Sequence, residues 1–407
     1  MIIPVKEWQY TPYAPLDRES VEAEYVKAEQ QRILAENFEK TMASELVIKV
    51  ISDIVESDYG LGKTVEIFRM YGGQINISYG FVAEKDGKQT QYFMRKYNRF
   101  ADENLIMLEH DFLKFLKDNG LNMVPEVIRT SAGTTYVKRE ELGKSYFWAI
   151  YEFLEGEDWY RWFDDTTPVD VCYKIGVAVA KFHSLSSQYD CKFVSNEPTL
   201  HEMMTEFKTI LPDFAKMQYN SIYHQTYCNN LDEILKAIDT ILTEITGETV
   251  KALPKVTVNG DLHQGNIKYD SEGNVVGLFD FDWVKTDARL NEIAGWMLYM
   301  VTSWQDHNDG EIYMDKMKAA MEGYQKTLKE IGQFPPLSET EAKALPYYIQ
   351  MCCIYNIVYW TAKDHYQTFD QINAYEYDYY LRHALRVRRS AEKFAGEIEK
   401  IVLEAQG

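Results

Sequence analysis

The chain has 407 residues, of which 46% are apolar and 26% are charged, and its formal net charge is −20. This length allows two or three lobes with separate cores, and the composition is ordinary for a globular protein. The negative charge argues against nucleic acid as the main partner, because phosphate backbones select basic surfaces. It either serves solubility or attracts a cationic small molecule.

The sequence carries no evident signal for membranes or secretion. No run of 18 apolar residues predicts a membrane-spanning helix, and the opening MIIPVKEWQYTPYAP lacks the features of a signal peptide. Five cysteines without a CxxC pair indicate reduced thiols rather than a disulfide framework or a zinc site. We therefore expect a cytoplasmic protein that binds neither membranes nor nucleic acid. The sequence does not predict an oligomeric state.

The first part of the chain predicts a helical extension followed by a small lobe of strands and one helix. The extension covers residues 1–58 and includes a highly charged surface helix over 17–40. Alternating apolar and polar residues then predict strands over 64–70, 75–87, 90–98 and 145–156. Between them, residues 102–118 have helical periodicity and end at an Asn-Gly pair. We expect the small lobe to span residues 59–153.

The rest of the chain, residues 154–407, predicts a mostly helical lobe with one β island. Helical patterns cover the segments 169–185, 200–218, 228–247, 287–304, 311–331, 338–365 and 373–404. The island, residues 255–283, is typical of a strand, a polar loop and a hairpin that turns at SEGN. The predicted fold class is therefore α+β. The polar loop lies at the junction of the two lobes, where ligand sites are common.

That polar loop is NGDLHQGN, residues 259–266, and DFDW follows it at residues 280–283. Phosphoryl transfer needs a carboxylate that orients the attacking hydroxyl and hard oxygen ligands for Mg²⁺. Asp261 and Asn266 supply such groups if the loop is compact, and Asp280 could bring a carboxylate across the hairpin. If the strand continues, Asp282 shares a face with Asp280. The alternative is an ordinary polar turn, with Asp280 as a helix cap.

These segments resemble the catalytic and metal segments of the aminoglycoside phosphotransferase and choline kinase superfamily, which includes homoserine kinase-type members. The resemblance implies a protein-kinase-like bilobal fold and a kinase that phosphorylates a hydroxyl of a small molecule. It further implies ATP, with GTP as an alternative, and Mg²⁺ as cofactors. It makes Asp261 the catalytic residue and Asn266 and Asp280 the metal ligands. Asn259 departs from the family, which usually has His at that place.

The N-terminal half carries further parts of the resemblance. YGGQINISYGF is similar to the family's nucleotide-covering loop, which implies that Gly72, Gly73 and Asn76 contact the nucleotide; an ordinary hairpin is the alternative. YFMRKYN is similar to the strand that carries a phosphate-anchoring cation, which implies Arg95. Lys96 is the alternative, because a one-residue slip exchanges the faces of a strand.

Other positions follow from the same resemblance. Glu109 lies where the family places the acid that pairs with the cation, although a solvent-facing glutamate is the alternative. The backbone around Glu152 and Leu154 lies where the family binds adenine. We interpret His183, Asp287 and Glu292 as architectural. His263 could orient the loop or contact the substrate.

The chemical class of the acceptor is predicted only from local composition. Acidic and aromatic residues gather at 155–165, 347–367 and 375–383, which would suit a cationic amino-alcohol or amino-sugar through cation–π contacts. Packing between helices is the alternative explanation, and homoserine, choline, ethanolamine and aminoglycosides all remain open. The rival function is a catalytically silent nucleotide-binding or scaffold protein. The chain has neither the D-F-G and A-P-E segments of protein kinases nor the G-x-S-x-G and H-E-x-x-H motifs of hydrolases.

Overall fold

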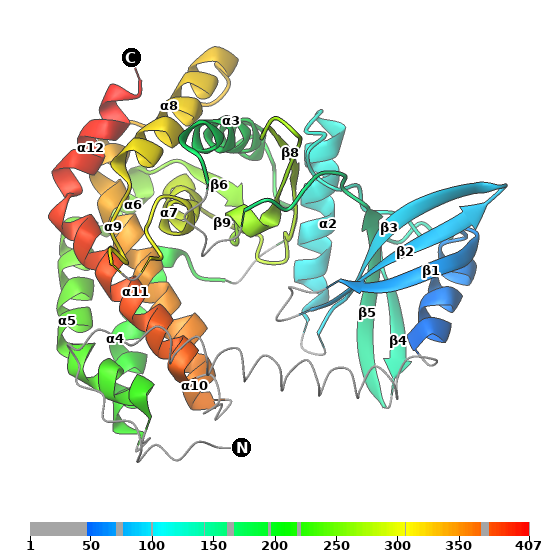
Figure 1. Cartoon of the computed structure of the whole chain (residues 1–407), viewed down its shortest axis with the longest axis horizontal. Helices are drawn as coiled ribbons and strands as arrows, with labels where there is room; N and C mark the ends of the chain where they lie inside the picture. The colour runs from blue at the N-terminus through cyan, green and yellow to red at the C-terminus, as the bar shows by residue number, and fades with distance from the viewer. Residues whose placement is uncertain are drawn as a thin grey trace.

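The computed structural model describes residues 47–70, 76–98, 101–141, 143–160, 167–193, 197–217, 221–305, 307–367 and 374–406. They form a small lobe built on an antiparallel sheet and a large, mostly helical lobe beside it (Figure 1). This confirms the predicted α+β class. The helix expected over residues 17–40 lies outside the described residues, and the lobe boundaries at 58 and 153 stay predictions.

The small lobe contains a five-stranded sheet in the order β1-β2-β3-β5-β4, with every neighbouring pair antiparallel. The strands are β1 (Lys63–Met70), β2 (Ile77–Lys85), β3 (Lys88–Lys96), β4 (Val137–Glu141) and β5 (Lys144–Glu152). Asp86 and Gly87 both have positive φ, as the predicted hairpin turn between β2 and β3 requires. Strand β4 was not predicted from the sequence, because VKREE does not alternate between apolar and polar residues.

The two faces of this sheet pack against different helices. Residues 47–53 and the π-helical turn η2 (Ile54–Asp58) cover one face, where Ile51 and Ile54 pack with Met94 and Trp148. Helix α2 (Glu103–Asp118) covers the other face and lies between the sheet and the helical lobe (Figure 1). Because side chains alternate along a strand, β3 directs Arg95 toward α2.

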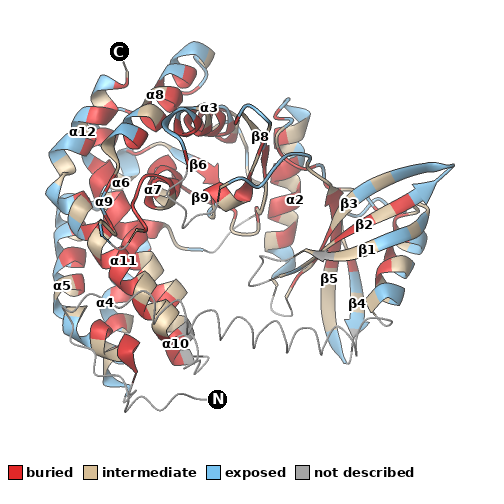
Figure 2. Cartoon of the chain, viewed as in Figure 1, coloured by how far each residue is buried: buried red, intermediate tan, exposed pale blue. Residues whose placement is uncertain are grey.

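The helical lobe is built mainly from long helices. Its helical segments are α3 (Val169–Ser186), α4 (Leu200–Lys216), α5 (Ile222–Glu244), α6 (Gly247–Ala252), α7 (Arg289–Met300), α8 (Met314–Ile331), α9 (Glu339–Asn356), η4 (Ile357–Lys363), α10 (Asp364–Gln367), α11 (Ala374–Lys393) and α12 (Ala395–Glu404). Figure 2 shows that buried residues concentrate on α3, α7 and α9 in its centre. The single helix predicted over 338–365 is instead divided by the π-helical turn η4, and the one over 373–404 is interrupted at Phe394. No helix in the described ranges is long and apolar enough to cross a membrane.

Helices α3 and α8 approach each other closely because each has a glycine at the contact. A Cβ atom on Gly176 would lie 2.1 Å from the carbonyl oxygen of Ala320, and one on Gly323 would lie 2.1 Å from that of Tyr173. Any larger residue at either position would push the backbones apart. This contact fixes α3, whose His183 reaches Glu292 at the base of the polar loop.

The β island consists of two short two-stranded sheets that flank the polar loop. Strand β6 (Lys255–Val258) pairs with β9 (Lys285–Ala288), and β7 (Ile267–Tyr269) pairs with β8 (Val275–Leu278). The 3₁₀ turn η3 (Gln264–Asn266) joins the loop to β7. Strand β8 ends at Leu278, and Asp280 has a φ of 61°. The expectation that Asp280 and Asp282 share a strand face is therefore wrong.

A buried ion pair joins the start of α7 to the start of α9. The Arg289 guanidinium donates to both carboxylate oxygens of Glu341, at 2.5 and 2.8 Å, and also to the carbonyls of Pro335 and Pro336. Glu341 also accepts from the backbone and hydroxyl of Ser338 in a capping box. The hydrogen bonds from Arg289 to this carboxylate are charge-assisted, so they depend on the negative charge of Glu341.

We expect Glu341→Gln to destabilise the helical lobe by about 3–5 kcal/mol, because it leaves the Arg289 charge buried without compensation. Urea unfolding measured against the wild type would show this loss. Glu339→Gln is the matched control, since Glu339 lies exposed in the same first turn. Equal stability of the two variants would contradict the assignment.

Candidate active site

The polar loop after β6 is held against the segment that follows β8. Gly260 has a φ of 85°, and a Cβ atom there would lie 2.4 Å from the carbonyl oxygen of Trp283. Only glycine allows this backbone conformation and this approach at once. The loop and the DFDW segment are therefore in direct backbone contact.

Glu292, in the first turn of α7, anchors the start of the loop. Its carboxylate accepts the backbone N–H groups of Asn259 and Gly260 at 2.8 and 3.1 Å. His183 lies behind it, with Nε2 3.5 Å from the carboxylate and Nδ1 2.9 Å from the Tyr324 hydroxyl. Burial lowers the pKa of His183, so the imidazole is neutral. Both residues have the architectural place that the sequence analysis gave them.

Asn259, the departure from the family pattern, connects the loop to the segment that follows β8 through its side chain. Its Nδ2 donates to the carbonyls of Phe279 and Asp280 at 3.3 and 3.0 Å, and its Oδ1 accepts the N–H of Asp261 at 3.0 Å. One amide therefore fixes the backbone of Asp261 relative to that of Asp280. The sequence alone offered no physical reason for this residue.

Asp261 lies at the centre of the loop beside Asn266. The Asn266 amide donates to the backbone carbonyl of Asp261 at 2.7 Å and to its Oδ2 at 3.2 Å. Burial, and then the negative charge of Asp280, raise the pKa of Asp261 to about 8. The structure thus brings together Asp261, Asn266 and Asp280, the three residues predicted for catalysis and metal binding.

Arg95 reaches the same place from the small lobe. Its Nη2 donates to Asp280 Oδ1 at 2.6 Å and its Nη1 donates to Glu109 Oε1 at 3.3 Å. Lys96 lies on the opposite face, with its Nζ 4.0 Å from the ring centre of Tyr146 and 5.1 Å from that of Trp148. Of the two candidate cations, Arg95 is the one that lies in the site.

Two tyrosines that the sequence analysis missed hold Glu109. The hydroxyls of Tyr97 and Tyr151 donate to Oε2 and Oε1 of Glu109 at 2.7 and 3.0 Å, both shorter than its contact with Arg95. His110 Nε2 lies 3.2 and 3.0 Å from the same two hydroxyls. Burial raises the pKa of Glu109, whereas Arg95 and the hydroxyls lower it. The strand alternation that places Arg95 in the site also predicts this face for Tyr97.

Asn76 connects the small lobe to Asp282. Its Nδ2 donates to Asp282 Oδ2 at 2.6 Å, and its Oδ1 accepts the N–H of Asn98 at 3.0 Å. The Oδ1 atom of Asp282 is buried and has no hydrogen-bond partner among the described residues. Gly72 and Gly73, predicted to contact the nucleotide with Asn76, lie outside the described residues.

The carboxylates in this site suit a divalent cation. Burial, and then the charge of Asp280, raise the pKa of Asp282 well above its usual value. The unpartnered Oδ1 atom of Asp282 is the kind of hard oxygen ligand that divalent cations such as Mg²⁺ bind. Among the residues that the structure describes, no group of three His, Cys, Asp or Glu side chains is arranged to hold a metal. A cation would therefore use an amide oxygen together with carboxylates, as the pair Asn266 and Asp280 offers.

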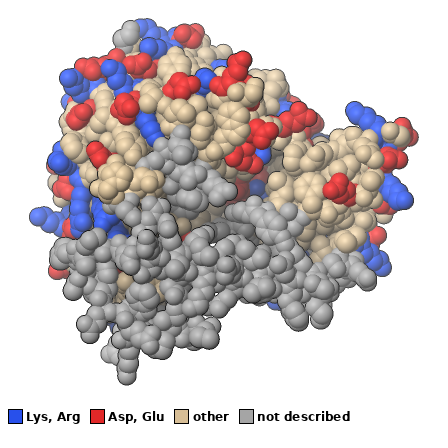
Figure 3. Space-filling model, viewed as in Figure 1, with Lys and Arg blue, Asp and Glu red and all other residues tan. Residues whose placement is uncertain are grey.

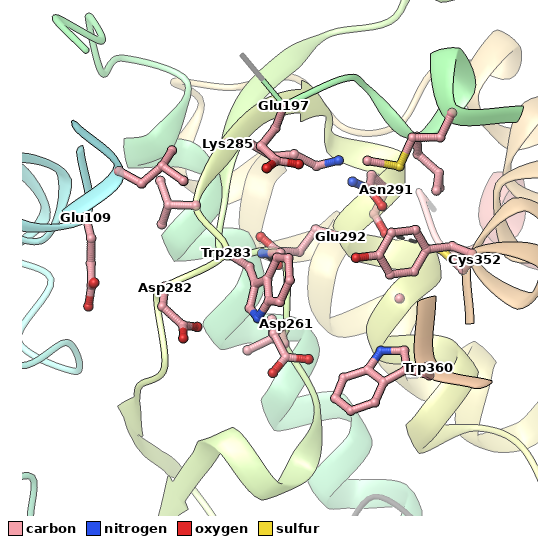
Figure 4. A pocket seen from close by; sticks show the side chains of 18 of the residues that line it. Glu109, Glu197, Asp261, Asp282, Trp283, Lys285, Asn291, Glu292, Cys352 and Trp360 are labelled. Carbon is pink, nitrogen blue, oxygen red and sulfur yellow. Dashed lines mark hydrogen bonds between the residues drawn. The ribbon is translucent and has the colours of Figure 1, made fainter. Parts of the chain in front are cut away.

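Two cavities open onto Asp261. The interlobe cavity, of about 510 Å³, runs between the lobes and is lined by residues that include Met70, Phe93, Arg95, Leu154, Asp261 and Asn266. The side cavity, of about 480 Å³, borders residues 282–285. Its lining includes Asp102, Glu197, Asp261, Lys285, Asn291 and Trp360. In Figure 4, Asp261 and Trp360 lie at one end of the side cavity, and Glu197, Lys285 and Asn291 lie at the other.

The connection between the lobes forms one wall of the interlobe cavity. Glu152 and Leu154 both line it, as does Phe153 between them. The backbone N–H of Glu152 donates to the Glu126 carbonyl at 2.8 Å, and its side chain accepts from Lys117 at 2.7 Å. A nucleobase at this wall would therefore have to use polar groups other than the Glu152 amide.

Comparison with known families decides the class of protein. Residues 72–327, more than half of the chain, match the model of the phosphotransferase enzyme family. The chain belongs to the phosphotransferase enzyme family. This confirms the predicted superfamily and the predicted enzyme class, a small-molecule kinase. No curated protein matches this phosphotransferase significantly.

Solved structures resemble this phosphotransferase at low sequence identity. An amicoumacin kinase in complex with AMP-PNP, Ca²⁺ and Ami is 15% identical with a TM-score of 0.59, and the match covers 86% of this chain and 93% of that one. A microcompartment-associated aminopropanol kinase is 13% identical with a TM-score of 0.62, covering 86% and 98%. A choline kinase from Cryptosporidium parvum Iowa II is 14% identical with a TM-score of 0.57, covering 88% and 99%. These likenesses confirm the protein-kinase-like bilobal fold.

We expect Asn259→Ala to lower turnover about 10- to 100-fold, because Asp261 and Asp280 lose the side chain that holds them in register. The free energy of unfolding should fall by about 1–3 kcal/mol, since two partly buried carbonyls lose a donor. Steady-state kinetics and urea unfolding measure the two effects. Asn274→Ala is the control, because Asn274 makes a comparable bond to Asp270 in the β7–β8 turn. Unchanged turnover in Asn259→Ala would contradict this role.

The pKa of Asp261 makes a prediction about stability. Its folded-state pKa of about 8 exceeds the value of about 4 expected in the unfolded chain, so the wild type loses stability as the pH rises from about 4 to about 8. Asp261→Asn has no proton to lose there. Its Tm should exceed that of the wild type increasingly across this window and match it near pH 4, in thermal scans without divalent cations. A difference that does not vary with pH would contradict the raised pKa.

Proposed function

We propose that this phosphotransferase transfers the γ-phosphoryl group of ATP to a hydroxyl of a small, cationic amino-alcohol or amino-sugar. One observation carries the proposal: Asp261 lines both cavities, so it lies where a nucleotide in one can meet an acceptor in the other. In-line transfer requires the acceptor oxygen and the leaving oxygen on opposite sides of the phosphorus. Two cavities that meet at one carboxylate fit this requirement.

The interlobe cavity is the proposed nucleotide site. Arg95 and the segment Glu152–Leu154 lie along it, where a cation could contact phosphates and a backbone could contact a base; nothing in these contacts separates ATP from GTP. Asn266 and Asp280 would hold Mg²⁺, which would supply positive charge against the β- and γ-phosphates. The neighbour solved with AMP-PNP and Ca²⁺ is consistent with nucleotide use.

Asp261 is the proposed base. The acceptor hydroxyl gives its proton to an Asp261 carboxylate oxygen while its own oxygen forms a bond to the γ-phosphorus. The bond from that phosphorus to the bridging oxygen breaks, and ADP leaves with the electron pair. Because only the unprotonated carboxylate can accept the proton, the raised pKa of Asp261 must fall when the charges around it are compensated.

The side cavity is the proposed acceptor site. Among the described residues that line it, the charged side chains are carboxylates except for Lys285, and Trp283 and Trp360 add indole rings. Carboxylates and aromatic faces together favour a cation. Asp378 of α11 contributes less, because it is paired with Arg382. Asp309, in the turn before α8, is likewise paired with His383 and Arg386.

The surface charge supports a cationic acceptor. On the face shown in Figure 3, acidic side chains extend across the helical lobe toward its junction with the small lobe, whereas basic side chains lie mostly at the outer margins. With a net charge of −20, this field would attract cations to the site. The solved structures that this chain resembles include amicoumacin, aminopropanol and choline kinases. We further propose a cytoplasmic location, because all five cysteines are free thiols.

A panel of acceptors tests the proposal. Purified protein with ATP and Mg²⁺ should phosphorylate one or more amino-alcohols or amino-sugars and leave neutral diols and sugars of similar size unchanged. Asp261→Asn should reduce turnover by about 10³-fold or more, because it removes the proton acceptor. Turnover of neutral acceptors alone would contradict the cationic class. Nucleotide binding without transfer to any acceptor would favour a catalytically silent protein.

A further inference from the structure

The polar loop, residues 259–266, fixes which ring nitrogen of His263 carries the proton. The backbone N–H of Gly265 donates to His263 Nδ1 at 3.0 Å. A nitrogen that accepts a hydrogen bond has no proton of its own, and a neutral imidazole has one proton to place. His263 is therefore neutral with its proton on Nε2.

That Nε2–H group is a donor without a partner. It lies 3.9 Å from Asp261 Oδ2, beyond hydrogen-bond distance, and no group in the described part of the chain accepts a bond from it. The Tyr299 ring packs against the imidazole with ring centres 5.6 Å apart and an angle of 64°. The loop and this contact together hold the donor in one orientation.

The location of His263 separates it from the proposed acceptor site. His263 lines the interlobe cavity together with Asn266 and Asp280. It is absent from the described lining of the side cavity, which includes its neighbours Asp261 and Leu262. A donor in this position faces the nucleotide side of Asp261.

We infer that His263 is a catalytic residue that donates a hydrogen bond from Nε2 to a non-bridging oxygen of the phosphoryl group in transfer. This inference rests on the proposed function. A hydrogen bond to the phosphoryl oxygens stabilises charge in the transition state, whereas one to the acceptor hydroxyl would weaken the nucleophile. His263 cannot serve as the base, because Nε2 holds a proton and the lone pair of Nδ1 is engaged. The acceptor proton goes to Asp261, and His263 keeps its own throughout.

His263→Asn tests this role. An asparagine can accept the Gly265 N–H through its own carbonyl oxygen, as in an Asx turn, but its shorter side chain leaves the position of Nε2 empty. We expect kcat to fall about 100- to 1,000-fold, the range for removal of one fixed donor. The KM values for ATP and acceptor should change less than about twofold, because a bond made in the transition state leaves substrate binding unchanged. The Tm should remain that of the wild type.

The control and an independent measurement separate the possible failures. His201→Asn changes a histidine outside both cavities that bonds to the Ile245 carbonyl, and it should keep the wild-type kcat. The ¹⁵N NMR signals of the His263 ring should show Nε2 protonated and Nδ1 unprotonated at neutral pH. A protonated Nδ1, or a full kcat in His263→Asn while Asp261→Asn is inactive, would overturn this inference and leave the proposed function intact. Absence of phosphoryl transfer by the wild type would overturn both.

Discussion

The site depends on holding several carboxylates close together in a largely buried place. Asp261, Asp280, Asp282 and Glu109 converge from both lobes, and Arg95 is the cation that contacts two of them. Such a cluster is unfavourable unless its charges are paired or protonated. A guanidinium suits this place better than an ammonium, because its planar fork donates to two acceptors in fixed directions. Arg95 uses one nitrogen for Glu109 in α2 of the small lobe and another for Asp280 in the helical lobe, so the charge balance of the site and the relative position of the lobes rest on the same side chain.

Around this cluster, neutral hydrogen bonds supply the geometry. Asn259 and Asn76 each connect two chain segments through one amide, and Asn266 closes the polar loop on Asp261. The hydroxyls of Tyr97 and Tyr151 hold Glu109. None of these donors adds charge, so they position carboxylates without neutralising them. The negative charge of the site therefore stays available for a cation. Glu292 is different, because its charge is directed at two backbone N–H groups and shapes the loop instead. The architecture thus separates residues that fix the backbone from residues that carry the chemistry.

Much of this arrangement could be predicted from sequence because it is local. The spacing of Asp261, Asn266 and Asp280 follows from one loop and one hairpin, and the two-residue period of β3 favours Arg95 on the face of the site. What could not be predicted depends on contacts between distant segments. Asp280 leaves the strand because its backbone turns left-handed between two packed segments, and Asn259 acquires its role only when Phe279 lies opposite. Tyr151 reaches Glu109 across 42 positions, and the side cavity exists only where α2, α4, α7 and α9 surround one space. Strand β9 is four residues long and has a charged start, so its pairing with β6 leaves little trace in the pattern.

The raised pKa of Asp261 connects these features to function. Burial contributes most to the rise of this pKa, and the negative charge of Asp280 contributes next. The part of the rise that Asp280 causes therefore depends on which positive charge pairs with Asp280. Arg95 contacts Asp280 in this structure, and it is also the side chain proposed to contact phosphates. On the proposed function, Arg95 would turn to the phosphates of a nucleotide in the interlobe cavity, and Asn266 and Asp280 would hold a cation that compensates the charge of Asp280. The proton on Asp261 is then held less tightly, at the moment when an acceptor hydroxyl needs a base. In this arrangement the carboxylate becomes an effective base only after the phosphoryl donor is in place, which disfavours activation of an acceptor, or of water, in the absence of nucleotide.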